Sequence, residues 1–575
     1  MKQNQAMANE MFGSFQKALS EGWQKALSSF GELGQGGDFG GGDPWNMPRF
    51  NFEPDKLLGI QRQYVEEAGE LWRQGLAVQP QGDKRFAAES WHQNPMAAFS
   101  AAVYLLNART LMSMAEAVEA DAKTKARLRF AVEQWMAASA PSNYMAFNAD
   151  AQQQALKTRG ESIAKGIQNL VHDIQQGHVS MTDESAFEVG RNVATTEGAV
   201  VFENELFQLL EYKPLTAKVY ERPLLLVPPC INKFYILDLQ PENSLIRHAV
   251  AQGHRTFVVS WRNPDESMGQ ATWDDYIEKA AIQAIQVVRE ITGQDKRGGQ
   301  INTLGFCVGG TILATALAVL AARGEQPAAS ATFLTTLLRF QDTGILDIFI
   351  DENFVRFREM QMGKGGLLPG GDLASTFSFL RPNDLVWNYV VGNYLKGETP
   401  PPFDLLYWNS DATNLPGPMY CWYLRNTYLE DKLADKNAVT VCGEKIDLRA
   451  IQSPVYIYGS REDHIVPIGG AYASTQILSG KKRFVMGASG HIAGVINPPA
   501  KKKRSFWTRE DGQLPASHAK WLEGATEHPG SWWSDWDLWL KGFGGKQIPA
   551  PKAYGKGTAY KAVEPAPGRY VKAKA

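Results

Sequence analysis

The chain has little cysteine and lacks any long run of apolar residues. Its 575 residues include only four cysteines and no C-x-x-C pair, so neither a disulfide framework nor a paired-cysteine site is expected. No apolar stretch reaches the roughly 20 residues that a membrane-spanning helix needs. The first residues are not followed by the apolar core of a secretory signal. These absences predict a cytoplasmic protein without a transmembrane segment.

The chain also lacks an excess of either charge and any cluster of metal-ligating residues. Its 59 Lys and Arg against 61 Asp and Glu give a net charge of −2, so nothing favours bulk electrostatic binding of nucleic acid. The nine histidines are scattered, and there is no Gly-rich phosphate-binding loop. We therefore expect no metal, no separate cofactor and no nucleic-acid partner.

The most informative pattern that is present is G-x-C-x-G at residues 305–309, centred on Cys307. A short strand candidate precedes it at 300–304, and an Ala- and Leu-rich helix candidate follows at 311–323. This arrangement is typical of the nucleophile elbow of α/β-hydrolases, where serine usually occupies the central position. Such a turn lifts the Cys307 thiol out of the sheet at the positive end of a helix. The alternative is a buried cysteine between small residues, but the strand, glycines and helix together favour a nucleophile.

Two later loops carry the acid and the histidine that a triad requires. A strand candidate at 454–458 leads to Asp463, and a second at 483–486 leads to His491. The order nucleophile, acid, histidine is that of α/β-hydrolases. The interval between Asp463 and His491 leaves room for one helix and one strand, as in the closing unit of such a sheet.

Neighbouring residues compete for both roles. Glu462 is an alternative to Asp463, and His464 is an alternative to His491. Asp463 is preferred because the shorter acid reaches a neighbouring loop without crossing it. His491 is preferred because it lies in a glycine-flanked loop directly after a strand. His464 is then either a residue that supports the site or a loop histidine without a role.

An oxyanion hole requires a second backbone N–H from the loop after an early strand. The buried strand candidate 224–227 is followed by Pro228 and Pro229, which cannot donate a hydrogen bond. Free amides follow directly, and Ile231 is the preferred donor, with Val308 as the other. An ordinary strand-end turn is the alternative.

Together these segments resemble the polyhydroxyalkanoate synthases, which make bacterial storage polyester. The resemblance covers roughly residue 80 to the last residue, and the long single chain resembles the class I, homomeric type. It rests on residues 83–91, 228–239, 305–310, 383–389, 461–467 and 489–494.

The resemblance implies an enzyme that polymerises short-chain (R)-3-hydroxyacyl-CoA, most simply 3-hydroxybutyryl-CoA, with release of CoA. It makes Cys307 the acylated nucleophile, with Asp463 and His491 as its partners, and it links Trp422 to a dimer contact. The CoA thioester is then a substrate rather than a cofactor. The implied partners are the growing polyester chain, the granule surface, granule-associated proteins and a second copy of the chain.

The predicted fold is α/β, an α/β-hydrolase with a mostly parallel central sheet flanked by helices. Residues 1–50 are expected to form an amphipathic helix and a Gly-rich linker, 51–185 a helical domain, and 186–575 the catalytic domain. The interval from Cys307 to Asp463 exceeds what two or three βα units need. We therefore expect a cap inserted at about residues 340–440.

Two other functions remain open at this stage. A cysteine-dependent thioesterase or polyester hydrolase would use the same fold and triad; cysteine in place of serine and the long insertion argue against it. A non-catalytic granule-coat protein would need no triad. The role of Asp463, on His491 or directly on the substrate 3-hydroxyl, also remains open.

Overall fold

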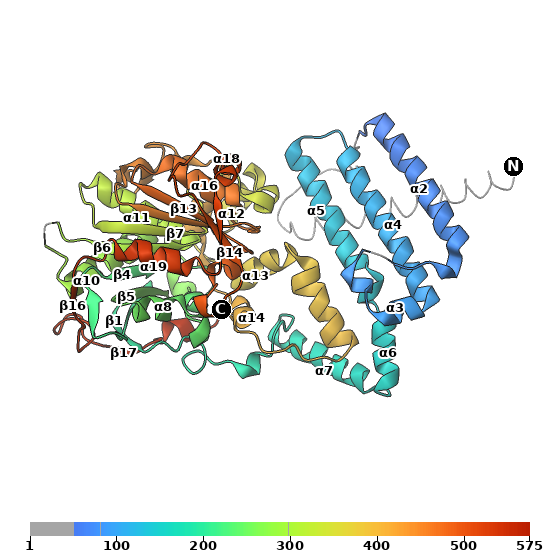
Figure 1. The fold of residues 1–575 in the computed structure, drawn as a ribbon, viewed down its shortest axis with the longest axis horizontal. Helices are drawn as coiled ribbons and strands as arrows, with labels where there is room; N and C mark the ends of the chain where they lie inside the picture. Colours follow the sequence, from blue (N-terminus) through green and yellow to red (C-terminus); the bar gives the residue numbers. More distant parts are fainter. Residues whose placement is uncertain (1–50, 81, 297) are drawn as a thin grey trace. The chain divides into compact units, whose positions relative to one another are not determined.

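The computed structural model describes residues 51–80, 82–296 and 298–575, which form two compact units (Figure 1). One unit extends to Glu184 and also contains Ser375–Pro402; the other consists of Ser185–Ala374 and Phe403–Ala575. The expected cap range is thus divided between the two units. The amphipathic helix expected within residues 1–50 lies outside the described residues. No helix among the described residues has the length and apolarity needed to cross a membrane.

The first unit is helical, as predicted. Several of its helices begin at side chains that accept hydrogen bonds from the first backbone N–H groups: Asn94 for α4, Asp121 for α5 and Asn148 for α6. α4 is buried on several sides because it packs between α2 and α5. The helices of residues 51–184 are α2 (Pro54–Gln74), α3 (Glu89–Gln93), α4 (Pro95–Ala117), α5 (Ala122–Ser139), α6 (Ala149–Lys157) and α7 (Glu161–Gln176).

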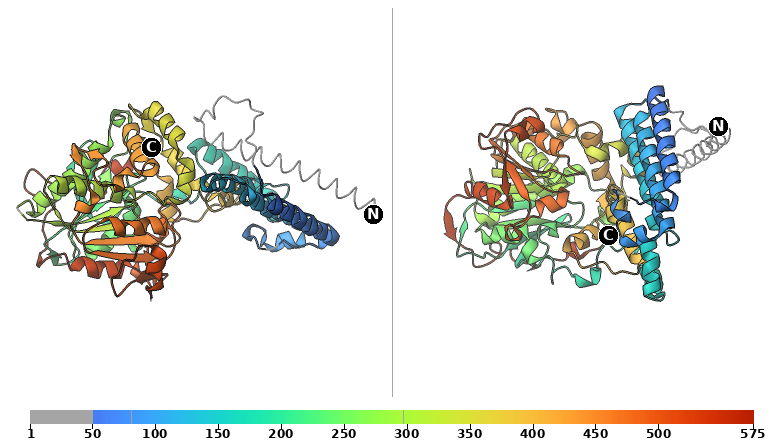
Figure 2. Two further views of the ribbon diagram at one scale, coloured as in Figure 1. Left: turned by 90° about the horizontal axis from the view of Figure 1, so that it is seen from above. Right: turned by 45° about the vertical axis from the view of Figure 1, so that its right-hand side comes forward.

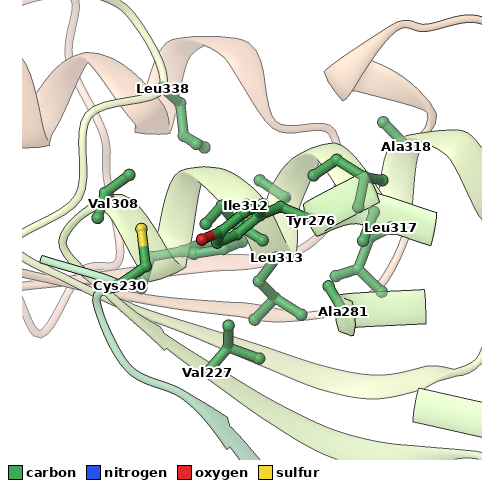
Figure 3. Packing of buried hydrophobic residues seen from close by; sticks show 14 of the residues in the cluster. Val227, Cys230, Tyr276, Ala281, Val308, Ile312, Leu313, Leu317, Ala318 and Leu338 are labelled. Atoms are coloured by element: carbon green, nitrogen blue, oxygen red, sulfur yellow. The ribbon is translucent and has the colours of Figure 1, made fainter. Parts of the chain in front are cut away.

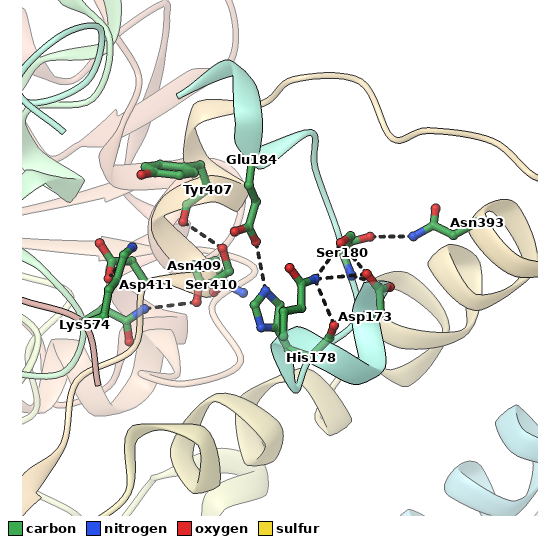
Figure 4. Close-up of polar contacts among 12 residues, drawn as sticks. Asp173, His178, Ser180, Glu184, Asn393, Tyr407, Asn409, Ser410, Asp411 and Lys574 are labelled. Atoms are coloured by element: carbon green, nitrogen blue, oxygen red, sulfur yellow. Dashed lines mark hydrogen bonds and ion pairs between the residues drawn. The ribbon is translucent and has the colours of Figure 1, made fainter. Parts of the chain in front are cut away.

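Residues 375–402 belong to this unit because they pack on α7. A side chain at Gly166 of α7 would overlap the Tyr394 carbonyl, so the two backbones are in close contact. The Tyr394 hydroxyl donates to Asp173 at 2.6 Å, and Asp173 also accepts from the Ser180 hydroxyl at 2.6 Å. Asn393 donates to the Ser180 carbonyl at 2.7 Å (Figure 4). Helical segments in this region are α13 (Gly370–Phe379), η10 (Asn383–Trp387) and η11 (Val390–Leu395).

The second unit is built on an eleven-stranded mixed sheet in the order β15-β14-β13-β12-β7-β6-β4-β5-β2-β1-β17. The central strands β13, β12, β7, β6, β4 and β5 pair in parallel, and the outer strands pair antiparallel. This confirms the predicted α/β fold. The parallel strands are β4 (Leu224–Val227), β5 (Thr256–Trp261), β6 (Ile301–Phe306), β7 (Ala328–Leu334), β12 (Val455–Ser460) and β13 (Lys482–Gly487). The outer strands are β1 (Gly198–Glu203), β2 (Phe207–Tyr212), β14 (Ser505–Thr508), β15 (Thr526–Pro529) and β17 (Glu564–Pro565).

Both faces of this sheet are buried under helices, as Figure 2 shows from two sides. Along β4 the side chains alternate between two apolar clusters: Leu225 and Val227 join one, and Leu224 and Leu226 join the other. The uninterrupted apolar run of β4 is typical of a parallel strand that is covered on both sides. The first face is covered by α10 (Gln283–Thr292) and α11 (Val308–Ala322), and the second by α8 (Leu245–Ala251) and α19 (Trp533–Lys541).

Candidate active site

Cys307 occupies the turn between β6 and α11. Its backbone has φ 54° and ψ −129°, a region that non-glycine residues rarely adopt and that is expected of a nucleophile elbow. The Cys307 N–H donates to the Leu334 carbonyl at 3.0 Å, and the Cys307 carbonyl accepts from the Gly310 N–H at 2.9 Å. The strained turn is therefore held from β7 on one side and from the helix on the other, with the thiol half-buried.

The glycines of the elbow are required by close backbone contacts. A side chain on Gly305 would overlap the backbone of Gly310, and one on Gly309 would overlap the carbonyl oxygens of Val227 and Pro228. Only glycine lets these segments approach so closely. The contact at Gly309 presses the first turn of α11 against the end of β4, and so brings the loop after β4 to the nucleophile.

The two predicted oxyanion donors come from these adjoining segments. Val308 is the first residue of α11, so its N–H has no acceptor within the helix. Ile231 is half-buried, and its N–H donates to no other described residue. The N–H of the next residue, Asn232, donates to the Thr413 hydroxyl oxygen at 2.8 Å and is therefore not available to an oxyanion. Figure 3 shows how Val308 packs in the apolar cluster that also contains Cys230.

Asp463 and His491 are in direct contact. His491 Nδ1 lies 2.6 Å from Asp463 Oδ2, and both side chains are buried. The second oxygen of Asp463 accepts from the N–H groups of Ile465 and Val466, each at 2.8 Å. The ring of Phe306 stacks on that of His491 with centroids 5.8 Å apart. The carboxylate and the imidazole are therefore held in one geometry.

The pKa of His491 depends on both Asp463 and Cys307. Burial by itself lowers the pKa of His491, but the Asp463 carboxylate, the charge of Cys307 and hydrogen bonds to both residues raise this pKa to about 10. Because Nδ1 is bonded to Asp463, the remaining ring nitrogen is the one available to Cys307. The structure thus brings together Cys307, His491 and Asp463.

The competing residues are placed differently. The Glu462 carboxylate is 54% exposed and pairs with Arg461 at 2.8 Å, so it points to solvent rather than to His491. His464 is half-buried and directly follows Asp463. Of the two acids, only Asp463 makes a hydrogen bond to His491 among the described residues.

Trp422 contacts its own chain. It lies in α15 (Gly417–Tyr423) and stacks on the buried Trp273, with ring centroids 4.7 Å apart and planes within 10°. Part of Trp422 stays accessible. The stacking on Trp273 holds the Trp422 ring in place.

An aromatic group beside Cys307 was not predicted from the sequence. The rings of Tyr423 and Tyr428 pack edge-on with centroids 5.6 Å apart, and Phe340 packs edge-on against Tyr428 at 4.9 Å. Burial is the largest cause that raises the pKa of both tyrosines. The charge of Cys307 is the next cause for Tyr428, and for Tyr423 it follows the charge of Tyr428. Tyr428 lies in a π-helical segment, η12 (Leu424–Leu429), whose wider turn changes which residues share a face. Ordinary helical periodicity therefore gave no signal for this pair.

Burial is the largest influence on the other three thiols: Cys230 and Cys421 are buried, and Cys442 is half-buried. Burial raises the pKa of Cys230 to about 12, of Cys421 to about 11 and of Cys442 to about 12. Thiolate is the reactive form of cysteine, so these three are poor nucleophiles near neutral pH. Within the described part of the chain, no group of three or more His, Cys, Asp or Glu residues is arranged to hold a metal ion.

The Asp463–His491 contact predicts a pH dependence of stability. The pKa of His491 in the folded state, about 10, lies above its ordinary value of 6.5. The protonated pair therefore stabilises the fold fully below about pH 6.5, and the contribution is lost as pH rises through 10. Asp463→Asn removes the largest cause that raises this pKa. We expect the unfolding temperature of the native chain to fall more steeply with rising pH over that range than the unfolding temperature of Asp463→Asn. Equal slopes would contradict the ion pair.

The parallel sheet, the elbow between β6 and α11, and the Cys307, His491 and Asp463 cluster define an α/β-hydrolase-fold protein. The family model described as "alpha/beta hydrolase fold" matches residues 223–498. A second model, "Poly-beta-hydroxybutyrate polymerase (PhaC) N-terminus", matches residues 82–249. The chain belongs to the poly(3-hydroxyalkanoate) polymerase family, as its curated relatives establish. The resemblance noted in the sequence is confirmed.

Two of these relatives cover most of both chains. The chain is 62% identical over 532 residues to a "Poly(3-hydroxyalkanoate) polymerase subunit PhaC" of Cupriavidus necator, covering 91% of this chain and 89% of that protein. It is 39% identical to the protein of the same name from Rhizobium meliloti, covering 91% and 87%. Among solved structures, a monoacylglycerol lipase of Paleococcus ferrophilus matches half of this chain with 14% identity and a TM-score of 0.31.

Proposed function

We propose that Cys307 carries the growing polyester as a covalent thioester, with short-chain (R)-3-hydroxyacyl-CoA as the substrate. The chain is an acyltransferase of the polyhydroxyalkanoate polymerase class by its family. The observation that supports the proposed chemistry is the chain of contacts from Asp463 through His491 to Cys307. 3-Hydroxybutyryl-CoA is the substrate that the class I resemblance favours.

In the first step, the Cys307 sulfur attacks the thioester carbonyl of the acyl-CoA. The proton of the thiol passes to His491 and then to the sulfur of departing CoA, so the new Cys307 thioester keeps the acyl-transfer potential. In the second step, the 3-hydroxyl of an incoming acyl-CoA gives its proton to His491, and its oxygen attacks the Cys307 thioester. An oxoester forms, and His491 passes the proton to the departing Cys307 sulfur. The lengthened chain is then a CoA thioester, which the first step returns to Cys307. A serine in place of Cys307 would lose the acyl-transfer potential at the first step.

The hydrogen bonds of Asp463 favour one of its two possible roles. One oxygen is bonded to His491, and the other accepts two backbone N–H groups. With both oxygens occupied, Asp463 is suited to orient His491 and stabilise its positive charge, rather than to take the proton of the 3-hydroxyl. The backbone N–H groups of Val308 and Ile231 would stabilise the oxyanion in each step.

A cover over the site would keep out water, which competes with the 3-hydroxyl and would turn the enzyme into a thioesterase. We assign this cover to the parts of the expected cap that lie in the second unit, residues 340–374 and 403–440. The aromatic group of Phe340, Tyr423 and Tyr428 beside Cys307 supports this assignment.

We further propose that the enzyme works in the cytoplasm as a homodimer. It would bind the surface of polyester granules together with granule-associated proteins. The accessible edge of Trp422 is the proposed dimer contact. Granule binding is supported by an exposed aliphatic stripe along α7, whose side chains are 40–70% exposed. The stripe consists of Ile163, Ile167, Leu170, Val171 and Ile174.

The decisive experiment incubates the chain with 3-hydroxybutyryl-CoA and follows CoA release and product mass together. We expect high-mass polyester to accumulate as CoA is released, and the enzyme to sediment with the polymer. A thioesterase would instead release CoA with free 3-hydroxybutyrate as the only product, and that result would overturn the proposal.

A further inference from the structure

One hydroxyl group holds the backbone on both sides of Ile231. The Thr413 hydroxyl donates to the Cys230 carbonyl at 2.9 Å and accepts from the Asn232 N–H at 2.8 Å. The Cys230 carbonyl belongs to the peptide group that precedes Ile231, and the Asn232 N–H belongs to the one that follows it. Thr413 is only 3% exposed, so both hydrogen bonds are shielded from water. A single buried side chain therefore fixes both peptide groups of Ile231.

The peptide group that joins Cys230 to Ile231 gives this contact a direction. A trans peptide group is planar, so its C=O and its N–H point in opposite directions. The Thr413 hydroxyl binds the C=O, and the Ile231 N–H, the proposed oxyanion donor, therefore points away from Thr413. Rotation of this peptide group would turn the N–H away from the oxyanion, and the hydrogen bond to Thr413 opposes that rotation.

The loop needs to be held because its backbone is unusual at Asn232. Asn232 has φ 61°, in the left-handed region that few residues other than glycine adopt. Its side-chain amide donates to the carbonyl oxygens of Trp408 and Asn409, each at 3.2 Å. The indole N–H of Trp408 donates in turn to the Lys233 carbonyl at 2.7 Å. The segment 408–413 thus holds this loop at further points besides the Thr413 hydroxyl.

The segment that carries Thr413 is itself anchored on its other side. The N–H of Asn414 donates to the Asn263 side chain at 2.9 Å, and the amide of Asn414 donates to the Pro264 carbonyl at 3.0 Å. A side chain at Gly370 would overlap the backbone of Thr413, so these two stretches of backbone are in close contact. Thr413 is therefore held in place independently of the loop that it binds.

We infer that Thr413 is a positioning residue of the oxyanion hole, whose hydroxyl aims the Ile231 N–H at the oxyanion formed during attack on the thioester. The inference rests on the proposed function, in which Ile231 and Val308 stabilise that oxyanion. An oxyanion donor acts through its placement relative to the charge that develops in the transition state. Loss of this placement should therefore slow the reaction without weakening the binding of substrate. Because residues 403–440 are assigned to the cover, the cover and the oxyanion donor would be linked through Thr413.

The test removes the Thr413 hydroxyl and then restores it. Thr413→Val keeps the branched shape of the side chain without the hydroxyl, whereas Thr413→Ser keeps the hydroxyl. With 3-hydroxybutyryl-CoA as substrate, we expect kcat for CoA release to fall about 10- to 100-fold in Thr413→Val, less than the loss of a whole oxyanion donor, with KM nearly unchanged. Thr413→Ser should return kcat close to that of the native chain.

Thr256→Val is the matched control. Thr256 is also buried, and its hydroxyl donates to the His254 carbonyl at 2.9 Å, at the amino end of β5. This end lies at the opposite edge of the sheet from Cys307, because β5, β4 and β6 are parallel. The control loses a comparable buried hydrogen bond but should keep the native kcat. An equal kcat in Thr413→Val and in the control, a failure of Thr413→Ser to restore kcat, or a loss confined to KM would each overturn the inference.

Two further measurements keep the outcomes apart. If Thr413→Val does not fold, Asn232→Gly loosens the same loop, because glycine adopts positive φ freely but lacks the amide that binds residues 408 and 409. A reduced kcat in that variant supports the inference, and a native kcat overturns it. Mass spectrometry of the acyl-enzyme separates the inference from the proposed function. An acyl group elsewhere than on Cys307 overturns the proposed function, whereas acylated Cys307 with a native kcat in Thr413→Val overturns the inference alone.

Discussion

Cys307→Ala is expected to abolish both the acyl-enzyme and the polymer, with a loss in turnover of about 10⁵-fold or more. The expectation follows from the elbow: Cys307 alone among the four cysteines stands at a strand-to-helix turn in contact with His491. None of the other three cysteines is expected to replace Cys307 as the nucleophile, because burial raises the pKa of their thiols. Turnover is measured as CoA release, and the acyl group is located by mass spectrometry.

Cys442→Ala is the matched control for this prediction. Cys442 is half-buried, and its N–H donates to Asp274 at 2.9 Å. We expect this variant to retain nearly the turnover of the native chain and to carry the acyl group on Cys307. An acyl group found on Cys230, Cys421 or Cys442 in the native chain would refute the assignment.

The second large effect is expected at His491. His491→Ala removes the base that takes the proton in both steps and leaves the buried Asp463 carboxylate without its partner, so we expect turnover to fall by roughly 10³-fold or more. A single-turnover measurement of CoA release isolates the first step and should show the same loss. The variant is expected to be less stable than the native chain, because the buried Asp463 loses its partner and Phe306 loses its stacked ring.

His464→Ala tests the choice between the two histidines. We expect a far smaller loss, because the hydrogen bond to Asp463 belongs to His491. If His464→Ala proved the more damaging variant, the base would be His464, and the contact between His491 and Asp463 would be structural only.

Much of the catalytic unit was predictable because its signals are local. The elbow at 305–309 needs glycines where backbones nearly touch, and the structure has such contacts at Gly305 and Gly309. The strand candidates before Asp463 and His491 correspond to β12 and β13. Parallel strands buried on both faces are uniformly apolar, so they stand out in the sequence, and their carboxyl ends must converge at one edge.

Other features depend on which distant segments meet. The predicted cap was one stretch in the sequence, yet Ser375–Pro402 packs on α7 because Gly166 admits the Tyr394 carbonyl there. Trp422 was singled out by resemblance, whereas its stacking on Trp273 depends on two helices that are far apart in the chain. No local pattern specifies such pairs.

The sequence by itself determined the α/β fold, the family, and the residue types and order of the candidate triad, because strand pattern, glycine spacing and loop position are properties of short segments. Only the tertiary structure decided that Asp463 rather than Glu462 meets His491, and that Tyr423 and Tyr428 lie near enough to Cys307 for its charge to raise their pKa. Side-chain direction and long-range contact decide such matters, and both arise from packing of the whole unit.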